Sequence, residues 1–71
     1  MSVIVAAGSD RGLMQRIVRA VRRRGLPAAV VAIDDPVPGW AVAVHSEDYF
    51  RATAIVGAYI KRTNKGGGKA P

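Results

Sequence analysis

Arginines dominate the side chains that could do chemistry in this chain of 71 residues. Eleven Lys and Arg against five acids give a net charge of +6, and six arginines fall between Arg11 and Arg24. Arg16, Arg19 and Arg23 recur at the spacing that places side chains on one helix face. Guanidinium groups pair bidentately with phosphate or carboxylate, so the pattern favours an anionic partner. The alternative is a solvated helix face whose arginines reflect GC-rich coding.

Phosphate contacts of this kind would give affinity without reading a base sequence. A second basic segment follows residue 50, so two stretches of the chain could contribute. The predicted contacts for an anion or a nucleic acid are Arg16, Arg19, Arg22, Arg23, Arg24, Lys61, Arg62 and Lys65.

Two glycine-containing segments are candidate phosphate sites. Residues 8–12 (GSDRG) join a predicted strand to a helix N-terminus, where free amides can hold an anion and Arg11 could assist. Asp10, however, puts a negative charge at that position, so we favour a turn and a helix cap. Residues 66–69 (GGGK) lack the spacing and the following Ser or Thr of a P-loop.

The chain offers little material for acid–base, nucleophilic or metal chemistry. His45 is the single histidine, Ser46 after it suits a helix cap, and the chain has no cysteine. The aspartates at 34–35 suit a turn, and the acids at 47–48 suit a helix start. A metal site built from His45 and these acids is the less favoured alternative. We therefore predict a non-enzymatic protein with no catalytic residue, no metal and no cofactor.

The first third of the chain predicts a strand followed by a helix. Residues 3–7 form a β-branched, continuously apolar run that is typical of a buried strand. Ser9 or Asp10 can cap the helix that follows, and Gly25 can end it. Its predicted core face consists of Leu13, Met14, Ile17, Val18 and Val21.

An apolar hairpin occupies the middle of the chain. Residues 28–33 and 40–44 read as strands, and 34–39, with two prolines and a glycine, reads as the connection. Strand alternation makes one sheet face bulky and leaves the other rich in alanine, which suits close approach by a partner surface. The second strand divides into Trp40, Val42 and Val44 on one side and Ala41, Ala43 and His45 on the other.

A second helix is predicted from Ser46 to about residue 62. Thr53 is the one polar residue between 52 and 60, so the solvated stripe of an ordinary surface helix is nearly missing. We interpret this as a helix side that is partly covered by something outside the core. The small residues on that side are Ala54, Gly57 and Ala58.

The element order predicts an α/β (α+β) fold. It is a small open two-layer sandwich, β-α-β-β-α, in which two helices cover one face of a three-stranded sheet. This is a ferredoxin-like unit without its last strand, so the edge at residues 3–7 would be unpaired. The predicted domain spans residues 1–62, and residues 63–71 form a basic, Gly-rich, flexible tail.

Parts of the chain resemble a small family of prokaryotic signal transducing proteins. The resemblance rests on residues 25–28 (GLPA) after a helix, and on 42–44 (VAV) ahead of 46–49 (SEDY) with Ala52 following. It covers about residues 10 to 60 and implies a ferredoxin-like or regulatory-domain-like half that binds rather than catalyses. The first strand and the arginine-rich helix lie outside the family pattern, and no functional residue is transferred.

Together these features predict a small basic structural or interaction protein. A chain this short buries only about 60% of its unfolded surface, and without disulfides self-association or assembly is the available source of stability. We expect a homo-oligomer or a subunit of a larger assembly, such as a minor virion or ribonucleoprotein component. The alternatives are a sequence-tolerant nucleic-acid-binding module and, third, a regulatory ligand-binding module.

The predicted contacts for self-association lie on the first strand, the alanine-rich sheet face and the second helix. No segment reaches the roughly 20 apolar residues of a membrane span, so we expect no membrane partner. The absence of cysteine makes a cytoplasmic or intracellular setting the default, and a virion is compatible with it. The predicted self-association residues are Val3, Val5, Ala41, Ala43, Ala54, Gly57 and Ala58.

Overall fold

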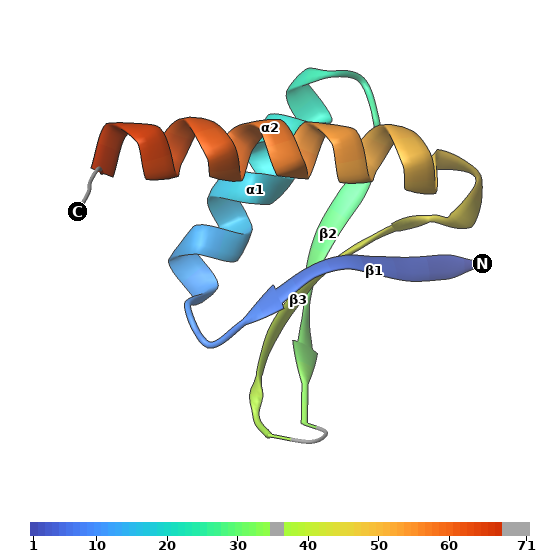
Figure 1. Cartoon of the computed structure of the whole chain (residues 1–71). Helices are drawn as coiled ribbons and strands as arrows, with labels where there is room; N and C mark the ends of the chain where they lie inside the picture. The colour runs from blue at the N-terminus through green and yellow to red at the C-terminus, as the bar shows by residue number, and fades with distance from the viewer. Residues whose placement is uncertain (35–36, 68–71) are drawn as a thin grey trace.

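The computed structural model describes residues 1–34 and 37–67, with side chains described up to residue 63. It confirms the α+β class and the β-α-β-β-α order (Figure 1). A single 3₁₀ turn, η1, adds to the predicted elements. The elements are β1 (Ser2–Gly8), α1 (Arg11–Arg23), β2 (Ala28–Ile33), β3 (Gly39–His45), η1 (Ser46–Asp48) and α2 (Tyr49–Gly67).

The three strands form one sheet in the order β1-β3-β2. Both outer strands pair antiparallel with β3, so β1 and β2 run parallel to each other and α1 is the crossover between them. β1 is an edge strand, as predicted. Its register to β3 shifts between Ile4 and Ala6, which leaves one extra residue on the edge strand.

α1 begins and ends at the predicted residues. The Asp10 carboxylate is the N-cap and accepts a hydrogen bond from the Leu13 amide at 3.1 Å. Gly25 follows the helix with φ of 89°, a left-handed conformation that side chains disfavour, and its amide donates to the Arg22 carbonyl at 2.9 Å. The cap and the glycine therefore fix the length of α1.

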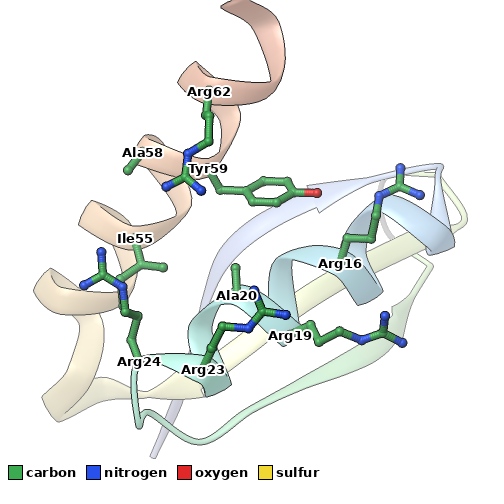
Figure 2. A pocket seen from close by; sticks show the side chains of 9 residues that line it. All are labelled: Arg16, Arg19, Ala20, Arg23, Arg24, Ile55, Ala58, Tyr59 and Arg62. Carbon is green, nitrogen blue, oxygen red and sulfur yellow. The ribbon is translucent and has the colours of Figure 1, made fainter. Parts of the chain in front are cut away.

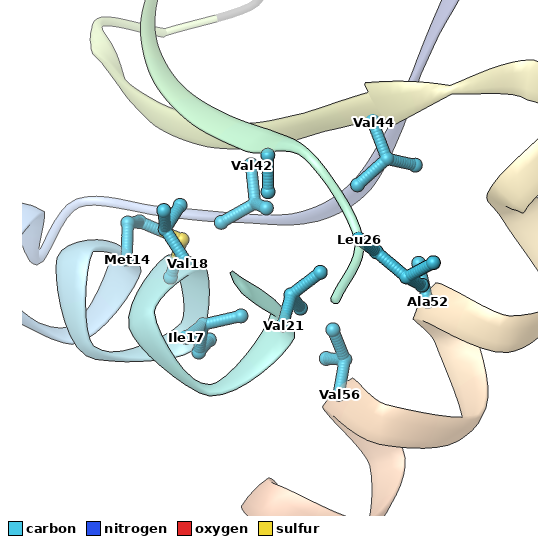
Figure 3. Close-up of a cluster of buried hydrophobic side chains, with 10 residues drawn as sticks. Met14, Ile17, Val18, Val21, Leu26, Val42, Val44, Ala52 and Val56 are labelled. Carbon is cyan, nitrogen blue, oxygen red and sulfur yellow. The ribbon is translucent and has the colours of Figure 1, made fainter. Parts of the chain in front are cut away.

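The core lies between the sheet and the two helices, which cover the same sheet face (Figures 1 and 3). Ile17 and Val21 of α1 and Val42 of β3 are its largest fully buried side chains. Ala52 and Val56 bring α2 against the same cluster. The predicted face of α1 is confirmed, with Leu13 partly buried at its rim. The buried members are Met14, Ile17, Val18, Val21, Leu26, Ala28, Val42, Val44, Ala52 and Val56.

The second helix differs from its predicted bounds. The chain first makes the turn η1, with His45 at the N-cap position and no side-chain capping bond, so Ser46 is not the cap. The Ser46 amide instead donates to the Met1 carbonyl at 2.8 Å, which joins the chain start to this turn. α2 then continues to Gly67, beyond the predicted boundary at 62, and residues 68–71 of the predicted tail lie outside the described residues. Residues 35–36 of the predicted connection also lie outside them.

α2, with 19 residues, is longer than α1 and is long enough to be compared with a membrane-spanning helix. Across residues 1–34 and 37–67, no helix is both long and apolar enough to cross a bilayer.

Candidate anion-binding groove

A groove of about 290 Å³ lies between α1 and α2, and arginines dominate its lining (Figure 2). α1 and the residue after it supply four of these arginines, and α2 supplies the fifth. The lining residues are Arg16, Arg19, Ala20, Arg23, Arg24, Ile55, Ala58, Tyr59 and Arg62.

The α1 side of the groove follows directly from helical periodicity. Arg16, Arg19 and Arg23 are three and four residues apart, so they line up along one side of the helix. With a rise of about 1.5 Å per residue, they span about 10 Å of the helix axis. Arg24 extends the row past the helix end, at the C-cap position. The helix dipole favours cations at this end, so Arg23 and Arg24 are compatible with a stable α1.

Small and apolar residues form the part of the groove where the two helices meet. Ala20 of α1 and Ala58 of α2 leave room between the helices because neither side chain extends beyond Cβ. Ile55 and Tyr59 of α2 are half-buried and also pack against the core. In Figure 2 the Tyr59 ring extends from α2 toward the Arg16 side of the groove. The groove thus combines an apolar floor with a basic rim.

All charged side chains that line the groove are positive. Its lining holds five guanidinium groups and no Asp or Glu. Like charges gathered around one concave surface raise the positive potential there and attract anions.

Most of the predicted anion contacts meet in this groove, but not all. Arg22 lies elsewhere: its Nε donates to the Ala28 carbonyl at 2.9 Å in a partly buried position, so it ties α1 to β2. Lys61 is exposed on α2 and is not among the lining residues. The side chain of Lys65 lies outside the described residues. The five that come together are Arg16, Arg19, Arg23, Arg24 and Arg62.

Sequence reasoning missed the contribution of Tyr59 to this site. The signal was present, because positions 55, 58, 59 and 62 share one face of a helix. Ala58, predicted as a self-association contact, lies in the lining of the groove, and its role in self-association stays a prediction. The position of α2 across α1, which only the tertiary structure gives, makes this face part of the site.

The segment at residues 8–12 is a turn and a cap, as favoured. The Asp10 carboxylate already occupies the helix N-terminus through its bond to Leu13. Arg11 lies over the Trp40 ring, with its guanidinium carbon 4.9 Å from the ring centroid. Arg11 is thus engaged with β3 rather than turned toward an anion at the turn.

The histidine and the acids at described positions lie apart from the groove lining. His45 is exposed at the end of β3. Within the part of the chain that the structure describes, no three side chains of His, Cys, Asp or Glu lie close enough together to hold a metal ion.

The other residues predicted for self-association fall into three groups. Val3 and Val5 pack against the core. Ala41 and Ala43 lie in the central strand, paired with both neighbours. Ala54 and Gly57 are exposed on α2. These contacts stay predictions.

Comparison of the chain with protein-family models, with curated proteins and with solved structures found no match. The resemblance to prokaryotic signal transducing proteins therefore stays a prediction.

Proposed function

We propose that this protein binds the backbone of single-stranded nucleic acid in the groove between α1 and α2. The observation that carries the proposal is the gathering of five arginines and no acid around one concave surface. A positively charged groove that follows the backbone is the usual basis of sequence-tolerant single-strand binding. The role is non-enzymatic and fits a subunit of a ribonucleoprotein.

The shape of the site favours a single strand over a duplex. A DNA major groove, about 12 Å wide, admits one helix. The arginine row of α1 lies beside α2, so α1 cannot enter a major groove alone. A single strand brings only one backbone, which one groove between two helices can follow. The half-buried Tyr59 ring offers one surface on which a base can stack, a contact worth about 1–3 kcal/mol.

Nucleic acid is favoured over an acidic protein because of the regular spacing of the cations. Arg16, Arg19 and Arg23 repeat along one line, which matches a ligand with an evenly repeated charge. A phosphate also accepts two parallel hydrogen bonds from one guanidinium. A regulatory small-molecule role, as the family resemblance implies, would need fewer cations than this groove provides.

The test is direct binding of a labelled single-stranded oligonucleotide of about 12 nucleotides, read by fluorescence anisotropy. We expect binding to single strands of unrelated base sequence and weaker binding to a duplex of the same length. The variant Tyr59→Leu keeps an apolar side chain and should weaken single-strand binding by about fivefold to 150-fold through lost stacking.

Two competitors separate the alternatives. Poly-glutamate that displaces the oligonucleotide as well as unlabelled RNA does would favour an acidic protein partner. Equal affinity for duplex and single strand would contradict the argument from the shape of the groove. An absence of nucleic-acid binding at low salt would refute the proposed function.

A further inference from the structure

In the described part of the chain, no helix packs on the sheet face opposite α1 and α2, which is apolar at its exposed positions, although Ala41 at its centre is fully buried. Ile4 and Val31 keep 48% and 37% of their surface exposed there, although both are large hydrophobic residues. No charged side chain lies among its members, although the chain carries a net charge of +6. An apolar surface of about 300 Å² is the size of the largest patch on a typical single-chain protein, and such patches are often functional. We call this surface the open sheet face; its members are Ile4, Ala7, Ala29, Val31, Ala41 and Ala43.

The strand register arranges these residues in two rows across the sheet. In one row Ile4 of β1 pairs with Ala43 of β3, which pairs with Ala29 of β2. In the next row Ala7 pairs with Ala41, which pairs with Val31. The large residue therefore stands at the β1 end of the first row and at the β2 end of the second. In both rows the central strand contributes alanine, and His45 follows on the same face beyond the first row.

This arrangement is complementary to itself. A two-fold axis parallel to the strands and lying between two copies exchanges the β1 and β2 positions. Ile4 of one copy then meets Ala29 of the other, and Val31 meets Ala7, so each large side chain meets a small one. Ala41 is fully buried and Ala43 is half-buried, so neither side chain stands above the sheet and the two sheets can approach closely. We propose that the open sheet face binds a second copy of this chain in a face-to-face, two-fold dimer.

The charge distribution supports a second copy as the occupant. The arginine groove is on the helix side of the sheet, so a dimer through the open sheet face keeps both grooves on its outer surfaces. The two positive clusters are then separated by two sheets and two helix layers. An acidic partner would gain nothing from an uncharged surface. The inference is independent of the proposed function, because it uses none of the groove residues.

The area of the open sheet face limits the expected affinity of the dimer. Strands of six and seven residues rise about 3.3 Å per residue and lie about 4.8 Å apart, so the face measures about 20 by 15 Å. A standard interface buries about 800 Å² on each partner. The contact is smaller than that, so we expect association with a Kd of about 10 µM to 1 mM.

Sedimentation equilibrium of the full chain tests this, in high salt so that bound nucleic acid cannot link two copies. We expect the mass to rise from 7.5 kDa toward about twice that value with increasing concentration. Ala43→Glu places a charge at the centre of the face and should weaken the dimer by more than tenfold. Ala54→Glu makes the same change at an exposed position of α2 and should leave it intact.

A size swap tests the orientation without adding charge. In the proposed dimer, Ala29→Ile places a second large side chain opposite Ile4 of the other copy. The clash should weaken association. Adding Ile4→Ala to that variant restores a pair of one large and one small side chain, so association should return toward the wild-type strength. Both positions are exposed, so circular dichroism should show unchanged folding.

Three results would overturn the proposal. One is a folded wild-type chain that stays monomeric at millimolar concentration. Another is a dimer lost in Ala54→Glu but kept in Ala43→Glu, which would place the contact on α2. A double swap that stays as weak as Ala29→Ile would reject the two-fold arrangement.

Discussion

The salt dependence of nucleic-acid binding gives a quantitative test of the groove. Each phosphate contact with a single strand contributes about 0.7 to the slope of log affinity against log salt. Five groove arginines therefore predict a slope of about −3.5. Between about 50 and 200 mM salt, affinity should fall by about a hundredfold.

A pair of double variants separates the groove from general surface charge. Arg19→Gln with Arg23→Gln removes two groove contacts, and Arg51→Gln with Lys61→Gln removes two exposed charges outside the lining. Both variants lower the net charge from +6 to +4 (6 − 2 = 4). Glutamine is a comparable helix former, so both helices should persist.

The expected result is a change of slope in one variant only. With three contacts left, the groove variant should show a slope of about −2.1, so affinity falls only about twentyfold over the same salt range. The control variant should keep a slope near −3.5, measured by anisotropy titration at several salt concentrations. The same loss of slope in both variants would refute the reasoning, because binding would then follow net charge rather than the groove.

Three further predictions concern stability, measured by urea unfolding with circular dichroism. Ile17→Ala empties a fully buried site and should cost about 2–5 kcal/mol of unfolding free energy; a loss below 1 kcal/mol would contradict the packing of the core. Asp10→Ala removes the cap of α1 and should lower the free energy of unfolding by about 1 kcal/mol, whereas Asp10→Asn, which can still cap the helix, should lower it much less. Gly25→Ala should destabilise by about 1–2 kcal/mol because φ is positive there, while Gly57→Ala, in open space within α2, should stabilise by about 0.5–1 kcal/mol. Equal effects at the two glycines would refute the conformational argument.

The fold could be predicted because its determinants are local. The apolar stripe of α1, its acidic cap and Gly25 all lie within a few residues of the boundaries that they set. The order of elements and the right-handed crossover then leave few topologies for three strands. The start of α2 was less predictable. Ser46 looks like a cap in sequence, but its amide bonds to Met1, a contact with the far end of the chain.

The groove was only half predictable for the same reason. The row of Arg16, Arg19 and Arg23 follows from helical spacing alone. That Arg62 and Tyr59 face this row depends on how α2 crosses α1, which no local pattern encodes. Arg22 could not be assigned from sequence either. Its place among the arginines suggests a surface charge, but its Nε donates a hydrogen bond to the Ala28 carbonyl.

The register shift in β1 bears on how far copies of this chain could polymerise. β1 and β2 are both edge strands, and edges that pair head-to-tail between copies would grow into an open fibre. The extra residue between Ile4 and Ala6 breaks the regular ladder of amides and carbonyls on one of these edges. A growing fibre would meet this mismatch at every junction. The irregularity therefore acts against edge-to-edge growth of the sheet and would leave the proposed two-fold dimer as a closed assembly.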